Sequence, residues 1–230
     1  MIVAAWICLL APLVAVVVIT LGGMQIPARI TGWIATASTS VSFAAAVAVL
    51  VKLLGEPSED RHHYSTAWTW LGAGQYHFGL TIFADPLSVF MMLIVSGVGS
   101  LIVAYSVGYM HGDVEERRYF AYIALFVFSM LMLVEGGNLL LLLVGWGLVG
   151  LSSYLLIGFW HERPSAVQAA KKAFVMNAFG DATMALALFI LVVHTHTLGF
   201  GALGQPLSGS VANWIALGLL GGAAAKSAQI

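Results

Sequence analysis

NLLLLLVGWGLVGLSSYLLIGFW, residues 138–160, is the stretch that decides the fold of this chain. It contains no charged residue, and as an α-helix with a rise of about 1.5 Å per residue it is about 34 Å long. The hydrocarbon core of a membrane is about 30 Å thick, so the stretch predicts a membrane-spanning helix. Its middle carries small and polar residues where lipid would favour Leu or Ile, namely Gly145, Gly147, Gly150, Ser152 and Ser153. Small residues let neighbouring helices approach closely, so one face of this helix is expected to pack against protein.

The composition of the whole chain agrees with a membrane protein. Hydrophobic residues make up 60% of the 230 residues, charged residues make up 8%, and the mean hydropathy is +0.96. Soluble domains carry about 25% charged residues, which argues against a soluble globule. These values predict an all-α fold, a polytopic bundle of transmembrane helices.

Several classes of function are disfavoured by what the sequence lacks. The formal net charge is −1 and no run of basic residues occurs, so nucleic acid is not an expected partner. Cys8 is the single cysteine, which excludes disulfides, zinc and iron–sulfur ligation within this chain. No GxGxxG, phosphate-loop, HExxH or CxxC motif is present. We therefore expect neither a cofactor-binding site nor a metal site in this chain.

Hydropathy predicts seven membrane spans. They cover residues 2–21, 30–54, 84–110, 119–134, 138–160, 169–193 and 212–230. The first span lacks a positively charged region before it, so we interpret it as a membrane helix and not as a cleaved signal. The last span has no polar exit before Ile230, and unpaired carbonyls in hydrocarbon are costly. We therefore expect a fragment of a longer protein, truncated in its seventh helix.

The distribution of Lys and Arg over the loops predicts the orientation, because positive charge accumulates on the cytoplasmic side. With the N-terminus outside, six basic residues fall in the inside loops and two in the outside loops. The inside set is Arg29, Arg117, Arg118, Arg163, Lys171 and Lys172, and the outside set is Lys52 and Arg61. The sequence therefore favours an N-terminus on the outside.

The long connection at residues 55–83 then lies outside the membrane. Aromatic and aliphatic residues alternate along it, and Gly72 and Gly74 separate its two halves, which predicts a β-hairpin that caps the outer surface. Its Trp and Tyr side chains are expected at the level of the lipid headgroups, not in a ligand site. The next residues predict a helix start, because Asp85 suits the N-cap and Pro86 the first turn.

Two ionisable side chains fall deep inside predicted spans, where a charge is costly and is by default a functional hypothesis. At about 1.5 Å per residue, Asp181 lies about 18 Å into the sixth span, Lys226 about 21 Å into the seventh and Gly147 about 14 Å into the fifth. All three are therefore expected near mid-membrane. Small residues surround Lys226, leaving room for water and for helix contact. The alternative is a lysine whose ammonium group extends to an interface.

Motifs along the chain resemble those of the antiporter-like, proton-pumping subunits of NADH-quinone oxidoreductase, respiratory complex I, and occur in the same order. They are DPLS at 85–88, YSVGYM at 105–110, VGWGLVGLSSYLLIGFW at 144–160, KAF at 172–174 with FGD at 179–181, and GGAAAKSAQ at 221–229. The motifs in the fifth and seventh spans are the specific ones. The first 80 residues fit by hydropathy and by the hairpin pattern alone.

The resemblance implies roles in a proton relay for four positions. Lys226 corresponds to the central proton-carrying lysine, Asp181 to an aspartate of the sixth helix, and Lys172 to a lysine that helps protons enter from the cytoplasmic side. Gly147 occupies the position of the family's relay glutamate. No acidic residue lies one turn away on the same face, so the coupling to Lys226 is either lost or passes to Asp181. By charge alone Lys172 reads as a positive-inside anchor, and Asp181 as a carboxylate satisfied by hydroxyls or water.

The resemblance also implies the organisation of the whole protein, with about fourteen to sixteen membrane helices built from two inverted repeats. Residues 1–110 would form the three leading helices, with the outer hairpin at 55–83, and residues 111–230 the incomplete first repeat, helices four to seven. The implied partners are the other membrane subunits of complex I, the lipid bilayer and protons, in a bacterial cell membrane. NADH, FMN, iron–sulfur clusters and quinone would belong to other subunits.

The implied function is movement of protons across the membrane, coupled to NADH oxidation by quinone elsewhere in the complex. Two alternatives stay open. One is the large subunit of a multi-subunit sodium/proton antiporter, which shares the same motifs. The other is a truncated structural remnant that moves no protons, an interpretation that Gly147 favours and the intact motif around Lys226 opposes.

Overall fold

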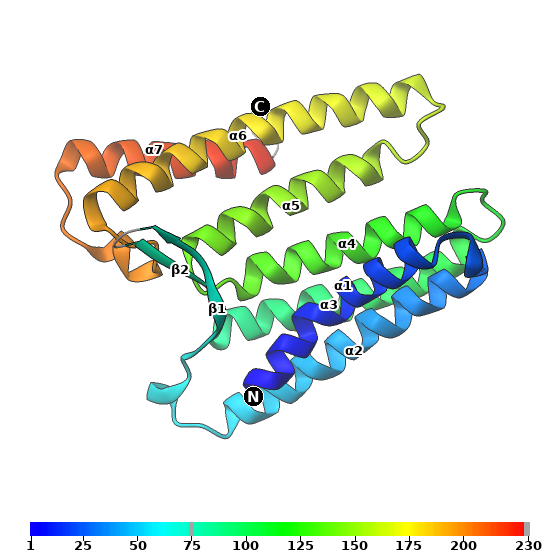
Figure 1. The fold of residues 1–230 in the computed structure, drawn as a ribbon, viewed down its shortest axis with the longest axis horizontal. Helices are drawn as coiled ribbons and strands as arrows, with labels where there is room; N and C mark the ends of the chain where they lie inside the picture. The colour runs from blue at the N-terminus through cyan, green and yellow to red at the C-terminus, as the bar shows by residue number, and fades with distance from the viewer. Residues whose placement is uncertain (74–75, 228–230) are drawn as a thin grey trace. The chain divides into compact units, whose positions relative to one another are not determined.

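The computed structural model describes residues 1–73 and 76–227, and of residues 58, 70–73 and 76–78 it describes the backbone alone. Seven α-helices and a β-hairpin account for most of the described chain (Figure 1). The helices are α1 (Ile2–Gly22), α2 (Ala28–Leu54), α3 (Pro86–Tyr109), α4 (Glu116–Glu135), α5 (Leu139–Ile157), α6 (Pro164–Thr195) and α7 (Gly209–Lys226). The strands are β1 (His63–Ala73) and β2 (Tyr76–Ala84), and three short 3₁₀ helices are η1 (Gly23–Gln25), η2 (Ser58–Asp60) and η3 (Phe200–Gly204).

Each predicted membrane span contains one of the α-helices, although the end residues 84–85, 110, 138 and 158–160 of the predicted spans are not helical. Helices α1 to α6 are each long and apolar enough to cross a membrane. The all-α membrane fold predicted from hydropathy is therefore confirmed. The seventh predicted span becomes α7, which ends at Lys226, and residues 228–230 of that prediction lie outside the described part of the chain.

The ends of the helices differ from the predicted spans by a few residues. Helix α6 begins at Pro164, where residue 169 was predicted, and α4 begins at Glu116, where residue 119 was predicted. Hydropathy marks the part of a helix that suits hydrocarbon, whereas the helical hydrogen bonds continue into polar first turns at the headgroup level. The predicted start of α3 is confirmed, because Asp85 is its N-cap and exchanges hydrogen bonds of 2.8 Å with Ser88.

The described chain forms two compact packing units. The first comprises Met1–Ser65 and Ile82–Glu135, and the second comprises Thr66–Thr81 and Gly136–Ile230. These units group helices by packing, whereas the predicted boundary at residue 110 separates leading helices from an internal repeat. That boundary therefore stays a prediction.

In the first unit, α2 and α4 each contact every other helix of the unit. Its core contains fully buried side chains from α2, α3 and α4, including Val49, Met92, Phe120 and Leu131. Buried hydroxyls are satisfied within the bundle, as where Ser42 of α2 donates to the backbone oxygen of Cys8 in α1 at 2.8 Å. Such bonds matter in hydrocarbon, where no water is present to satisfy polar groups.

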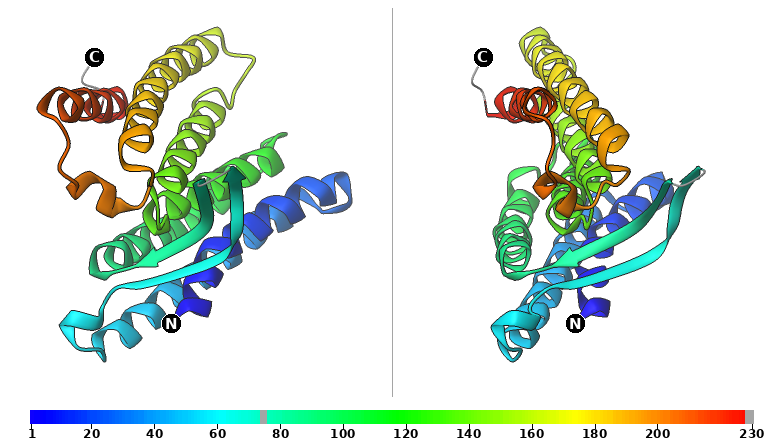
Figure 2. Two further views of the ribbon diagram at one scale, coloured as in Figure 1. Left: turned by 60° about the vertical axis from the view of Figure 1, so that its left-hand side comes forward. Right: turned by 90° about the vertical axis from the view of Figure 1, so that its left-hand side faces the viewer.

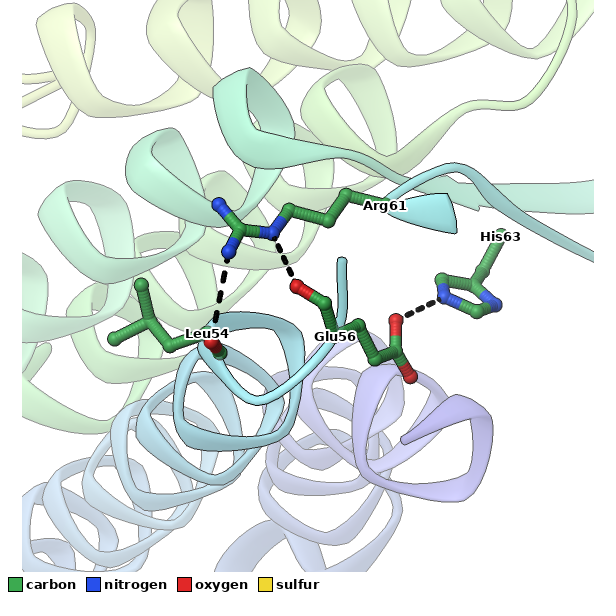
Figure 3. Close-up of polar contacts among 4 residues, drawn as sticks. All are labelled: Leu54, Glu56, Arg61 and His63. Atoms are coloured by element: carbon green, nitrogen blue, oxygen red, sulfur yellow. Dashed lines mark hydrogen bonds and ion pairs between the residues drawn. The ribbon is translucent and has the colours of Figure 1, made fainter. Parts of the chain in front are cut away.

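The segment that leaves α2 is held by polar contacts (Figure 3). The Arg61 guanidinium donates from Nε to the backbone oxygen of Glu56 at 2.9 Å and from Nη2 to that of Leu54 at 3.5 Å. The Glu56 carboxylate lies 2.6 Å from Nε2 of His63, at the start of β1. The last carbonyls of α2 would otherwise lack partners, so these contacts fix the chain where it leaves the helix.

The predicted hairpin is confirmed as a two-stranded sheet of β1 and β2, whose strands run side by side in both views of Figure 2. The hydroxyls of Thr66 and Thr81 bond across it at 2.8 Å, and the rings of Tyr64 and Phe83 stack at 4.4 Å. Residues 74–75 and the side chains of 70–78 lie outside what the structure describes, so the predicted placement of most of its aromatics stays a prediction.

In the second unit, Asn138 joins the hairpin to the start of α5. Its side-chain oxygen accepts from the backbone N–H of Leu141 at 2.9 Å, and its amide nitrogen donates to the backbone oxygen of Gly79 at 2.9 Å. Helix α6, which carries Lys172 and Asp181, packs against both α5, which carries Gly147, and α7, which carries Lys226. A buried cluster stabilises this packing and consists of Leu139, Leu188, Leu191, Leu198, Ala202 and Ile215.

Candidate functional site

Lys226, in the last turn of α7, is half-buried and reaches across to α5. Its ammonium nitrogen donates a hydrogen bond to the backbone oxygen of Trp146. The same nitrogen lies 5.1 Å from the centroid of the Trp146 ring, within the range of a cation–π interaction. The lysine is therefore directed into the protein, which disfavours the alternative of an ammonium group extended to an interface.

Asp181 of α6 is the acidic residue that faces the same stretch of α5 as Lys226. Its Oδ1 atom is buried and has no hydrogen-bond partner among the described residues. Burying a carboxylate without hydrogen bonds is costly, whereas a nearby cation offsets part of that cost. The position of Lys226 thus supplies the electrostatic reason for an acid at this depth in α6.

Two glycines of α5 that follow Trp146, Gly147 and Gly150, face these charged groups. A Cβ atom placed on Gly147 would lie 4.0 Å from Oδ2 of Asp181, and one placed on Gly150 would lie 3.3 Å from Nζ of Lys226. Residues three apart share a face of a helix, so α5 turns a side without side chains toward the pair. The position of the family's glutamate therefore faces Asp181 of α6.

Trp146 also belongs to this site, although it was not among the residues predicted from the sequence. Besides its carbonyl and ring, its indole Nε1–H is buried and has no hydrogen-bond partner among the described residues. This donor and Oδ1 of Asp181 both belong to the second packing unit, and both lack a hydrogen-bond partner among the described residues. Bound water often supplies the missing hydrogen bonds in buried polar sites. In the sequence, only its position next to Gly147 could have indicated Trp146, because sequence motifs do not reveal a role played by a backbone carbonyl.

The helices that carry the pair approach closely because glycines line their contact. A Cβ atom on Gly218 of α7 would lie 2.7 Å from the backbone oxygen of Thr183, and one on Gly221 would lie 2.8 Å from the Thr183 hydroxyl. On the α6 side, a Cβ atom on Gly180 would collide with that of Ala225. Figure 2 shows α7 beside α6 in both views. These glycines therefore set how closely α6 and α7 approach each other.

Gly218→Ala is expected to destabilise the protein by about 1–3 kcal/mol, because an added methyl group in a tight contact forces the helices apart. Thermal unfolding in detergent measures this effect. Gly209→Ala, at the start of the same helix, is the matched control, because no described atom lies within 4 Å of the new Cβ. Equal stability of the two variants would contradict the close contact.

Lys172, the fourth candidate, does not join this cluster. It is exposed and lies nine residues before Asp181 on α6, which is about 14 Å along the helix axis. The structure therefore brings together Lys226, Asp181 and the Gly147 position, but not Lys172. Within the described part of the chain, no group of three or more His, Cys, Asp or Glu side chains is arranged to hold a metal ion.

Two family models match the chain. The model described as NADH-Ubiquinone oxidoreductase (complex I), chain 5 N-terminus, matches residues 70–120. The model described as NADH:quinone oxidoreductase/Mrp antiporter, TM, matches residues 136–230, which include the whole candidate site.

Curated relatives and a solved structure agree with these models. NADH-quinone oxidoreductase subunit L of Mycobacterium tuberculosis (strain ATCC 25618 / H37Rv) is 43% identical over 98% of this chain, and that of Escherichia coli (strain K12) is 41% identical over 83%. The chain spans 36% and 32% of the lengths of these two relatives. A chain in the structure of the Mrp complex from Dietzia sp. DQ12-45-1b matches 97% of this chain with a TM-score of 0.73 and 26% identity, and 23% of its own length is covered.

Proposed function

The chain belongs to the family of antiporter-like membrane subunits of NADH-quinone oxidoreductase and Mrp antiporters, and we propose that it is the N-terminal part of a chain L that moves protons across the membrane. The proton movement is coupled to NADH oxidation by quinone, which takes place in other subunits of the complex. The observation that carries this proposal is the bond from Lys226 to Trp146 in the matched segment, with Asp181 facing Gly147, the next residue of α5.

The proposed mechanism uses the proton affinity of the Lys226 amine. A lysine in a protein interior gains or loses its proton according to its burial and its nearest charges. When Lys226 is protonated, Asp181 stabilises its charge, and when the proton leaves, the amine remains close to the Trp146 carbonyl. A change in the distance between the amine and the carboxylate then changes the affinity for the proton. Because Gly147 supplies no acid, Asp181 serves as the partner of Lys226 in this chain.

Proton transfer needs carriers on either side of Lys226. The unsatisfied Trp146 Nε1–H and Asp181 Oδ1 favour bound water near the pair, and water passes protons along hydrogen bonds. Lys172 is proposed to favour entry from the cytoplasmic side, since it is an exposed cation at the start of α6. This direction follows from the N-terminus lying outside and the membrane being the bacterial cell membrane, both of which are part of the proposal.

The protein's partners in this proposal are the other membrane subunits of complex I. NADH, FMN, the iron–sulfur clusters and quinone are bound by those other subunits. The second candidate function is the large subunit of a sodium/proton antiporter. The structural likeness to a chain of the Mrp complex favours it, as does the family description that includes Mrp antiporters.

The experiment that separates these functions is purification of the complex that contains the full-length protein. With an affinity tag on this chain in its native membrane, we expect the purified complex to oxidise NADH with quinone. Recovery of a complex that exchanges sodium for protons in vesicles, with no NADH oxidation, would instead establish the antiporter. A complex with neither activity would favour the structural remnant.

A further inference from the structure

The first packing unit contains a cavity that the proposed proton path does not use. It has a volume of about 410 Å³ and lies where α1 ends and α4 begins. Its wall is apolar on one part and cationic on another. Its lining includes Ile19, Thr20, Glu115, Arg117, Arg118 and Tyr122.

Arg117 is held in place by one part of its guanidinium group. Its Nη2 donates to the backbone oxygen of Ile26 at 2.6 Å, which fixes the side chain against the turn after α1. Its Nε is buried and has no hydrogen-bond partner among the described residues. Because Arg117 also lines the cavity, its positioned guanidinium suits an anionic oxygen there, since charge-assisted bonds from arginine to phosphate are strong.

Arg118 adds a second cation and Glu115 an opposing charge. Arg118 forms an ion pair with Glu115, and its guanidinium carbon lies 5.9 Å from the centroid of the Tyr122 ring. With two cations and one anion, the wall has a formal charge of +1. A ligand with a single negative charge therefore complements it.

The depth of the cavity indicates where such a ligand resides. Helix α1 ends at Gly22 and α4 begins at Glu116, so the cavity lies at one end of two membrane-crossing helices, the level of the lipid headgroups. A second hollow of the same unit is lined by Arg29, Trp33 and His111, close to the start of α2 and the end of α3. Cationic side chains beside Trp are typical of the interface between membrane and water.

We propose that the cavity between α1 and α4 binds the headgroup of an anionic phospholipid, with the phosphate on Arg117 and Arg118 and an acyl chain leaving along Ile19. Basic pockets between transmembrane helices recognise lipids of this kind. The apolar part of the wall favours a lipid over free phosphate, because inorganic phosphate has nothing to place against Ile19. The inference depends on the chain crossing a membrane, and it stands whether or not the chain moves protons.

The test uses the full-length protein in its assembled complex, stripped of lipid with detergent and titrated with radiolabelled phosphatidylglycerol. We expect one saturable class of site. Arg117→Gln with Arg118→Gln should weaken binding about 25-fold, since each basic residue near an anionic lipid contributes about fivefold, the factor that corresponds to ~1 kcal/mol. Glu115→Gln should strengthen binding, because it removes the opposing charge and leaves Arg118 to the lipid.

Two controls test whether binding depends on this cavity and on the charge of the lipid. Arg163→Gln should not change the titration, because Arg163 is an arginine beside an aromatic ring, Trp160, in the other packing unit. Phosphatidylcholine should bind far more weakly than phosphatidylglycerol. The proposal is overturned if the arginine variants bind as the parent does, or if Glu115→Gln leaves affinity unchanged. Displacement of the lipid by an equal concentration of inorganic phosphate would indicate a free-phosphate site, and no saturable binding would mean that protein covers the cavity.

Discussion

Lys226→Ala in the full-length protein is expected to abolish or sharply reduce proton pumping while NADH oxidation by the rest of the complex persists. Alanine has no group that can hold the proton, and loss of a proton-transferring side chain typically lowers a rate by about 10²–10⁴-fold. The measurement is the initial rate of acidification in inverted membrane vesicles on addition of NADH, with NADH oxidation recorded in the same sample. Unchanged pumping would contradict the assignment of Lys226 to the proton relay.

A second substitution at the same site separates the charge of Lys226 from its ability to release a proton. Lys226→Arg keeps the cation near Trp146 and Asp181, but a guanidinium stays protonated at any physiological pH. Pumping should therefore stay low in this variant although the helices remain packed. Lys52→Ala removes an exposed lysine near the end of α2 and should leave pumping intact. Full pumping by Lys226→Arg would mean that the residue serves only as a fixed charge.

Asp181→Asn is expected to lower pumping by about tenfold or more, the change that corresponds to ~1.4 kcal/mol of lost interaction with Lys226. The amide has nearly the same shape as the carboxylate but carries no charge to stabilise the ammonium group. Gly147→Glu in the same chain should restore much of the activity. Its Cβ atom would lie 4.0 Å from the position of the Asp181 Oδ2, so the new carboxylate replaces the lost charge from α5.

The matched control for this rescue is Gly147→Gln combined with Asp181→Asn. Glutamine occupies the same volume without a charge, so restored pumping in that variant would show that packing, not charge, was recovered. Gly147→Glu alone should raise pumping, because it adds a second acid near Lys226, and an unchanged rate would mean that the missing acid is compensated elsewhere. If Asp181→Asn pumps like the parent, Asp181 is not the partner of Lys226.

Much of the fold could be predicted from the sequence because membrane helices are local structures. Every backbone group must be satisfied within hydrocarbon, so an apolar stretch such as residues 138–160 has almost no alternative to a helix. The hairpin followed from alternation around glycines, and the start of α3 followed from Asp85 and Pro86, which act on neighbouring residues. The polar first turns of α4 and α6 escaped hydropathy because they add helical hydrogen bonds without adding apolar surface.

The sequence by itself determined that Asp181 and Lys226 lie deep within the predicted membrane spans and that α5 has no acid at position 147. Only the tertiary structure decided that Asp181 faces Gly147 and that Lys226 bonds to the carbonyl of Trp146. The rotation and spacing of a helix depend on which residues of other helices it meets, here Gly218 against Thr183. Such contacts join positions far apart in the chain, so no local motif encodes them.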